Sequence, residues 1–115
     1  SCLFANANNL DNLIAIIDYN KWQATGKTQD ILKLGSLTEK FKSFGWNTYE
    51  INGHDHKEIL QKLKLAKSHK NNPSVIIANT TKGKGISFME NDNNWHYRSP
   101  SYEELLKAKK ELKIL

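Results

Sequence analysis

Short apolar stretches, separated by longer amphipathic ones, set the pattern of hydrophobic positions along this chain. Residues 13–17 form an isoleucine-rich run bounded by polar residues, and residues 46–51 and 74–78 follow as two further strand-like runs. Short apolar runs of this kind are typical of strands buried in a parallel sheet. We therefore expect three strands, the first of which ends at Asp18 or Tyr19.

The segments between and after these strands carry apolar residues at helical spacing. Each expected helix begins with a capping-box pair, in which two side chains bind the first free amides of the helix. The pairs are Ser36 with Glu39, Asp55 with Glu58, and Ser101 with Glu104. The residues expected to face inward are Leu37, Phe41 and Phe44; Ile59, Leu60, Leu63 and Ala66; and Leu105, Ala108 and Leu112.

With a further helix in residues 1–9, the order is helix, strand, helix, strand, helix, strand, long loop, helix. That alternation predicts an α/β fold, with a partial three-stranded parallel sheet flanked by helices and joined by right-handed crossovers. A sheet this small leaves edges that complete proteins normally pair or cover. Because the chain also begins with Ser1 and not with methionine, we expect it to be part of a larger domain.

Composition narrows the class of protein. The 115 residues are 38% hydrophobic and 25% charged, a composition typical of a soluble globular protein. A chain of this length is expected to form no more than one domain. The single Cys2 excludes an intramolecular disulfide, so we expect a reducing, cytoplasmic location. No apolar run approaches the roughly 20 residues of a membrane helix, and no membrane partner is expected.

The chain is basic, with 17 basic against 12 acidic residues and a net charge of +5. Such a balance favours phosphate-bearing partners in general without selecting one. The lysines are spread through the expected helices, where solvated faces account for them. A nucleic-acid partner is not expected, since no motif of aromatic and basic residues accompanies the charge.

Asn20 lies at the start of the loop that follows the first strand. In open α/β sheets, ligands bind at the carboxyl ends of the strands. The amide oxygen of Asn20 and the peptide carbonyls after it are hard donors that suit Mg²⁺. The alternative is that Asn20 only shapes a turn, because asparagine readily bonds to its own backbone.

Two later segments also carry candidate chemistry. Lys82 lies in a glycine-flexed basic loop after the third strand, where backbone amides and lysine charge suit a diphosphate; the alternative is a mobile surface turn. His96 follows Trp95 in the long loop and can donate to phosphate or transfer protons; the alternative is a surface histidine. His54 and His56 are better explained as solvated residues beside the helix cap Asp55 than as metal ligands.

These segments together resemble the thiamine-diphosphate-binding domain of transketolase, and the resemblance covers almost the whole chain. It rests on the order and spacing of Leu10-Asp11-Asn12-Leu13, Asp18-Tyr19-Asn20, Phe44-Gly45-Trp46, Asn52-Gly53-His54-Asp55, Thr81-Lys82-Gly83-Lys84-Gly85-Ile86, Ser87-Phe88-Met89-Glu90-Asn91 and Trp95-His96. Residues 1–115 are thereby identified as the C-terminal portion of such a domain.

The resemblance implies a role for five residues. Asn20 would bind Mg²⁺ (or Ca²⁺) through its side chain, and Trp22 through its backbone carbonyl. Ala24 would lie near the thiazolium ring, and Lys82 near the cofactor, although other family members have an apolar residue at that position. His96 would contact the diphosphate and the donor sugar, and is the implied catalytic residue.

The implied enzyme is a transferase of the pentose phosphate pathway. It moves a two-carbon ketol unit between sugar phosphates with thiamine diphosphate, usually as a homodimer. The family's Gly-Asp-Gly segment, its activating glutamate and its neighbouring domain have no match in this sequence. We therefore expect the fragment alone to be inactive and to need the rest of its chain or a partner subunit. The alternative is a non-catalytic interaction module that keeps the fold without the cofactor.

Overall fold

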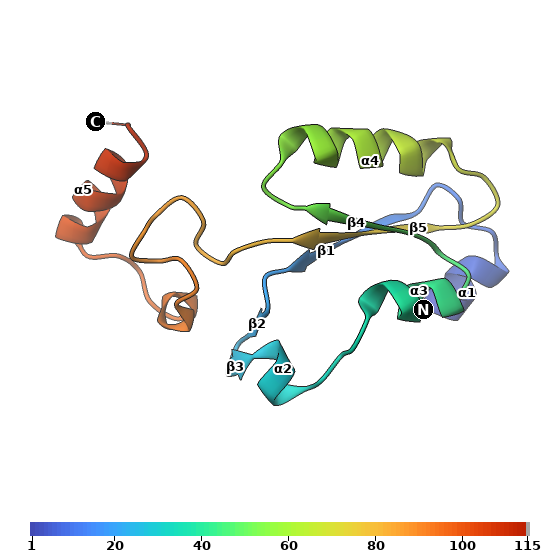
Figure 1. The fold of residues 1–115 in the computed structure, drawn as a ribbon, viewed down its shortest axis with the longest axis horizontal. Coiled ribbons are helices and arrows are strands. Elements are labelled where there is room, and N and C mark those ends of the chain that lie inside the picture. The colour runs from blue at the N-terminus through green and yellow to red at the C-terminus, as the bar shows by residue number, and fades with distance from the viewer. Residues whose placement is uncertain (115) are drawn as a thin grey trace. The chain divides into compact units, whose positions relative to one another are not determined.

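The computed structural model describes residues 1–114, which form two compact units. The first, the sheet unit, comprises Ser1–Tyr19 and Leu34–Thr80. The second, the loop unit, comprises Asn20–Lys33 and the residues from Thr81 onward. The elements labelled in Figure 1 are α1 (Cys2–Ala7), β1 (Ile14–Tyr19), β2 (Trp22–Gln23), β3 (Gly26–Lys27), α2 (Thr28–Ile31), α3 (Leu37–Ser43), β4 (Asn47–Asn52), α4 (His56–Ser68), β5 (Ser74–Asn79), η1 (Asn93–His96) and α5 (Tyr102–Glu111).

The sheet unit is built on a three-stranded parallel sheet, so the predicted fold class is confirmed. The strand order is β1-β5-β4, which places the last strand of the sequence in the middle. Asn79 at the end of β5 pairs in register with Tyr19 of β1 and Asn52 of β4. The three strands therefore end in one row, and the segments that follow β1 and β5 both leave from the carboxyl edge of the sheet.

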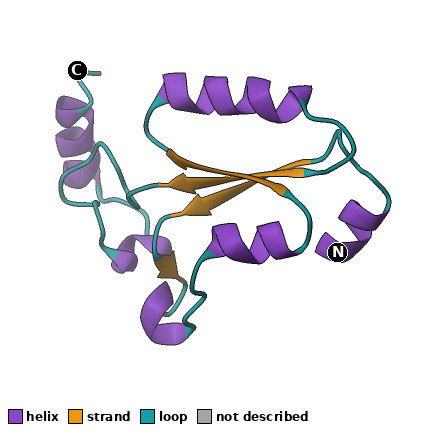
Figure 2. Ribbon diagram, turned by 45° about the vertical axis from the view of Figure 1, so that its right-hand side comes forward, coloured by secondary structure: helices purple, strands orange, loops and turns teal. Residues whose placement is uncertain are grey.

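Helices cover both faces of this sheet (Figure 2). On one face Val75 and Ile77 of β5 join Trp46 and Ala5 in a buried cluster. On the other face Ile76 and Ala78 pack with residues of β4 and α4. Because successive strand residues point to opposite faces, an unbroken apolar strand such as β5 fits only between two layers of helix.

Side-chain caps begin the helices where the sequence predicts them. The hydroxyl of Ser36 accepts the amide of Glu39 at 3.1 Å, and the carboxylate of Asp55 accepts the amides of Lys57 and Glu58 at 2.8 and 3.2 Å. Asp55 is thus engaged as a cap, as expected. Glu58, however, does not close a capping box on Asp55, since its carboxylate accepts the amide of Asn52 at 2.6 Å. That bond ties the start of α4 to the end of β4.

The prediction of inward-facing residues is wrong for three leucines. Leu60 is 58% exposed, because α4 packs on β4 and β5 through the narrower stripe of Ile59, Leu63 and Ala66. In α5, Leu105 and Leu112 are 41% and 45% exposed, and Ala108 is the buried residue of the helix. A short helix that packs on a loop buries fewer positions than its apolar pattern offers.

The loop unit holds elements that the sequence did not indicate. The segment after β1 folds back as the β2–β3 hairpin and then forms α2, and the long loop before α5 contains the 3₁₀ helix η1. At the start of α5, both halves of the capping box between Ser101 and Glu104 are present. No helix within residues 1–114 is both long and apolar enough to cross a membrane.

Candidate functional site

The β2–β3 hairpin sets the direction of two oxygen atoms. The side-chain oxygen of Asn20 accepts the amide of Trp22 at 2.9 Å. Trp22 pairs with Lys27, and the amide of Thr28 donates to the carbonyl of Lys21 at 2.9 Å, so Trp22–Lys27 is the non-hydrogen-bonded pair of the hairpin. The amide and carbonyl of Trp22 therefore both point away from β3. The Trp22 carbonyl thus faces the same side as the Asn20 side chain.

His96 lies at the end of η1 and is exposed. The turn begins at Asp92, whose carboxylate accepts the backbone amide of Asn94 at 2.9 Å. The ring of Tyr97 meets the imidazole of His96 edge-on, with the ring centroids 4.6 Å apart. The histidine is therefore carried by a capped turn and oriented by a neighbouring ring, as a proton donor or a phosphate ligand requires.

Within the loop unit η1 lies beside the hairpin (Figure 2), and hydrogen bonds join the two. The side-chain nitrogen of Asn93 donates to the carbonyl of Gln23 at 3.2 Å and to that of Ala24 at 3.0 Å. The hydroxyl of Tyr97 donates to the same Ala24 carbonyl at 3.1 Å. The segment that carries Asn20, Trp22 and Ala24 is thus held against the turn that carries His96.

Lys82 lies in a loop that closes on itself. Its carbonyl accepts the amide of Asn91 at 2.9 Å. Glu90 points into the loop, where it accepts the amide of Gly85 at 3.1 Å and pairs with the ammonium of Lys84 at 3.4 Å. No ion pair to Lys82 occurs within residues 1–114. Of the two lysines in this loop, Lys82 is therefore the better candidate to meet an anion.

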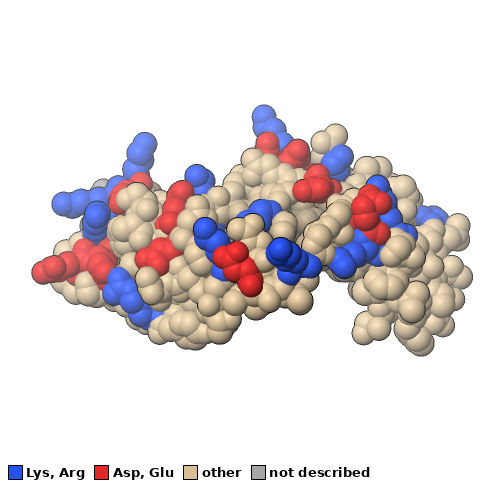
Figure 3. Space-filling view, turned by 60° about the horizontal axis from the view of Figure 1, so that its bottom comes forward, with Lys and Arg blue, Asp and Glu red and all other residues tan. Residues whose placement is uncertain are grey.

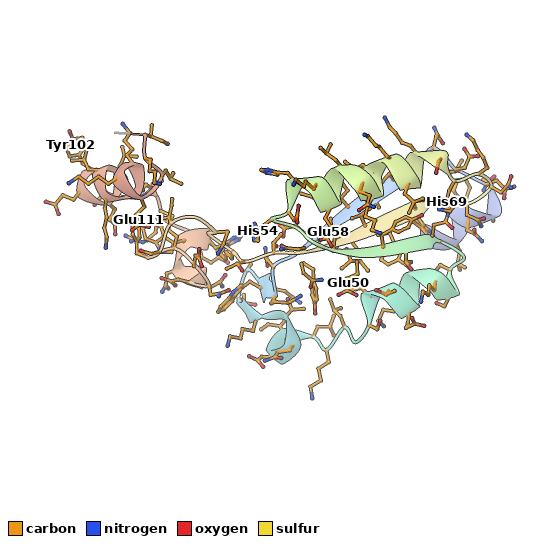
Figure 4. The ribbon with its side chains drawn as sticks, turned by 45° about the horizontal axis from the view of Figure 1, so that its top comes forward. Glu50, His54, Glu58, His69, Tyr102 and Glu111 are labelled. Atoms are coloured by element: carbon orange, nitrogen blue, oxygen red, sulfur yellow. The ribbon has the colours of Figure 1, made fainter. Side chains whose placement is uncertain are left out.

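Helix α5 anchors this loop through Glu111 (Figure 4). The carboxylate accepts the backbone amide of Ser87 at 2.6 Å and its hydroxyl at 2.8 Å. These bonds favour the ionised form, and they hold the pKa of Glu111 below its ordinary value, the amide of Ser87 having the largest effect. The far end of the loop is thus fixed to a helix.

A stack of cations and aromatic rings holds the start of α5. The guanidinium of Arg98 lies 3.8 Å from the centre of the Trp95 ring and pairs with Glu104 at 2.5 Å. The Trp95 ring packs on Phe88 at 5.4 Å, and its indole nitrogen donates to the Phe88 carbonyl at 3.0 Å. Lys107 of α5 lies over the Phe88 ring at 5.0 Å. Trp95 therefore anchors the turn that carries His96.

Comparison with known protein families assigns residues 1–114 to the thiamine diphosphate binding domain of transketolase. The chain belongs to the transketolase family. It is 35% identical over 112 residues to one subunit of the apulose-4-phosphate transketolase of Phocaeicola vulgatus, a match that covers 97% of this chain and 40% of the relative. It is 46% identical over 90 residues to one subunit of the 6-deoxy-6-sulfo-D-fructose transketolase of a Clostridium species, covering 78% of this chain and 33% of that one.

A solved transketolase has the same fold. The transketolase of Campylobacter jejuni superimposes with a TM-score of 0.89 at 32% identity, over 97% of this chain and 17% of the other. The chain therefore spans well under half the length of these transketolases.

The transketolase-like positions named from the sequence all lie in the loop unit: Asn20, Trp22, Ala24, Lys82 and His96. The structure joins the hairpin to the His96 turn by hydrogen bonds, whereas the backbone of Lys82 is bonded within its own loop. The roles of these five residues stay predictions.

Sequence reasoning missed the residues that connect the loops of this transketolase-family site, above all Asn93 and Tyr97. The one signal in the chain was the polar run of residues 91–94, which superficially resembles a calcium loop. In the structure Asp92 of that run caps η1, and Asn93 bonds to the hairpin.

Proposed function

We propose that this chain binds the diphosphate end of thiamine diphosphate and its Mg²⁺ (or Ca²⁺), as the C-terminal portion of a cofactor-binding domain in a larger transketolase. The enzyme would transfer a two-carbon ketol unit from a ketose phosphate to an aldose phosphate. Family membership supports the cofactor. The observation that carries the proposal is the hairpin, which turns the Asn20 amide oxygen and the Trp22 carbonyl to the same side.

The chemistry of these donors fits a hard cation. Mg²⁺ is bound by oxygen ligands in near-octahedral geometry and is commonly shared with substrate phosphates. Within residues 1–114 there is no group of three or more His, Cys, Asp or Glu side chains that could hold a metal ion. Asn20 and Trp22 would therefore supply two neutral ligands, and the diphosphate and a carboxylate from elsewhere in the enzyme would supply the negative charge.

The remaining site residues would bind and orient. Lys82 would neutralise diphosphate charge, and His96 would donate a hydrogen bond to phosphate or substrate oxygens and exchange a proton there. Ala24 would leave space beside the thiazolium ring. When bound, thiamine diphosphate supplies the electron sink for breaking and forming the carbon–carbon bond, so the protein's contribution is orientation and electrostatics.

The substrates and partners follow from the relatives by analogy. Two of them are named for different sugars, apulose 4-phosphate and 6-deoxy-6-sulfo-D-fructose, and both are named as subunits. We propose sugar phosphates as substrates, and a second chain or a further part of the same chain to complete the site, in a homodimeric cytoplasmic enzyme of carbohydrate metabolism. On the face shown in Figure 3, basic side chains are interspersed with acidic ones, which is typical of a solvated surface.

Replacing Asn20 by alanine in the complete enzyme tests the metal assignment. Asn20→Ala removes one of the two proposed protein ligands, so the Mg²⁺ concentration for half-maximal activity should rise roughly 100-fold or more, beyond the 10- to 100-fold effect of outer-shell changes. Titration of activity and of thiamine diphosphate binding with Mg²⁺ measures this.

Asn20→Asp is the matched control, because an aspartate keeps both the acceptor for the Trp22 amide and an oxygen for the metal. It should retain a Mg²⁺ requirement far closer to that of the wild type. An unchanged requirement in Asn20→Ala would refute the assignment and leave Asn20 as a turn former. A folded wild-type enzyme that binds no thiamine diphosphate would favour the non-catalytic interaction module instead.

A further inference from the structure

We infer that Asn93 is a positioning residue that holds the metal-binding hairpin in register with the His96 turn, an inference that rests on the proposed function. Its side chain bonds to two consecutive carbonyls, those of Gln23 and Ala24, at 3.2 and 3.0 Å. Both belong to the segment that continues from Trp22, whose carbonyl is the proposed metal ligand. Asn93 itself touches neither the metal nor the substrate in this assignment.

The chemistry of the contact fixes the orientation of the amide group. Carbonyl oxygens only accept hydrogen bonds, so the atom that faces both of them must be the amide nitrogen of Asn93. That nitrogen carries two hydrogens, enough for one bond to each carbonyl. The Ala24 carbonyl accepts a second bond from the hydroxyl of Tyr97 at 3.1 Å, which occupies both of its lone pairs.

The hairpin depends on these bonds because it is too short to hold its own shape. Each of its strands has two residues, and isolated hairpins of even greater length are at best marginally stable in water. Fixing the Gln23 and Ala24 carbonyls fixes the two peptide planes that follow the Trp22–Gln23 peptide. The hairpin, whose pairing directs the Trp22 carbonyl, is therefore held in place from outside by η1.

The same turn sets the side on which His96 lies. Asn93 and His96 are the first and last residues of η1, three positions apart. In a 3₁₀ helix the side chains at positions i and i+3 are eclipsed, so Asn93 and His96 share one side of the turn. Since Asn93 faces the hairpin, the imidazole is presented on that side as well. One asparagine thus places both the proposed metal ligand and the proposed phosphate ligand.

Asn93→Leu in the complete protein, with its partner chain where one is required, tests this coupling. The change keeps the shape of the side chain and removes both donors. The Mg²⁺ concentration for half-maximal binding of thiamine diphosphate should rise roughly 10- to 100-fold, as for other residues that orient a metal ligand. Calorimetric titration measures this concentration. The fold decrease in kcat at saturating Mg²⁺ should be much smaller than the fold increase in the half-saturating Mg²⁺ concentration.

Asn94→Leu is the matched control, since it makes the same change one residue along, where the side-chain amide bonds to Asp92 at 2.8 Å. It should leave half-saturation unchanged. Tyr97→Phe removes the other donor to Ala24 and should shift half-saturation in the same direction by a smaller factor. That variant decides the matter if Asn93→Leu does not fold.

Three results would overturn the inference. A wild-type protein that binds no thiamine diphosphate defeats the proposed function and the inference together. Wild-type binding with no change in Asn93→Leu or Tyr97→Phe defeats the inference alone. Equal weakening in Asn93→Leu and Asn94→Leu also defeats it, because the effect would then be a general disturbance of η1.

Discussion

The sheet unit and the loop unit differ in the forces that hold them together. In the sheet unit Val75, Ile76 and Ile77 are at most 2% exposed and pack against helices on both faces. In the loop unit the segments are joined by hydrogen bonds, ion pairs and stacked rings. Examples are the hydrogen bond from Asn93 to the hairpin and the one from the Ser87 amide to Glu111. Apolar burial organises the first unit, and directional polar contacts organise the second.

This difference in forces corresponds to a difference in the role that we propose for each unit. Apolar burial is non-directional and scales with area, so it makes a stable platform without aiming any one atom. A hydrogen bond is worth only about 1 kcal/mol net, but it fixes the direction of a carbonyl or an amide. A cation and a diphosphate are bound by atoms aimed in specific directions. We therefore expect the loop unit to have lower local stability than the sheet unit and to carry the chemistry.

Truncating a buried isoleucine should give the largest effect. Ile76→Ala, at a residue 1% exposed, should destabilise the sheet unit by about 4 kcal/mol through lost burial and the cavity left behind. Ile31→Ala in the loop unit, at a residue 49% exposed, should cost about 1 kcal/mol. Hydrogen exchange of peptides from each unit of the complete protein measures both, and equal costs would contradict the contrast between the units.

Adding a methyl group at Gly83 should have a smaller and more local effect. Gly83 has a φ of +71°, and a Cβ there would lie 2.4 Å from the carbonyl oxygen of Met89. Gly83→Ala should cost about 2–3 kcal/mol, from the left-handed backbone and the crowding together. Faster hydrogen exchange in residues 81–91, with the sheet peptides unchanged, is the expected result.

Gly35→Ala separates the two causes, because Gly35 has a φ of +63° with nothing within 4 Å of the added Cβ. It should show only the backbone cost of about 1–2 kcal/mol. If Gly83→Ala cost no more than this, the close packing of the Lys82 loop would be refuted.

Lowering the pH is expected to have the smallest effect on the stability of the protein. The pKa of Glu111 lies below its ordinary value of 4.5 because Ser87 donates to the carboxylate. A lowered pKa stabilises the folded state above the unfolded value, and this contribution is lost as the pH falls through the folded one. The anchor of the Lys82 loop to α5 should therefore weaken below about pH 4.5, seen as a titration of the Ser87 amide signal by NMR.

Glu111→Gln should abolish that titration. Glu103→Gln, in the first turn of the same helix, should leave it unchanged. A Ser87 amide that titrates alike in both variants would mean that another group reports there.

The sequence allowed most of the sheet unit to be predicted, because its signals are local. The apolar runs located the three strands, and Ser36 and Asp55 marked the starts of two helices in this unit. Ser101 marked the start of α5 in the loop unit in the same way. The inward faces were predicted less well, since the exposure of Leu60 depends on how much sheet lies beneath α4. The β2–β3 hairpin was missed because strands of two residues are too short to show a periodicity.

For the candidate site, the sequence by itself determined which residues carry suitable chemistry, namely Asn20, Lys82 and His96, since side-chain type and position after a strand can be read locally. Only the tertiary structure decided that β5 lies between β1 and β4, and that Asn93 bonds to a carbonyl 70 residues earlier. Contacts between residues so far apart leave no spacing pattern in the chain, because they depend on where the intervening sheet brings each segment.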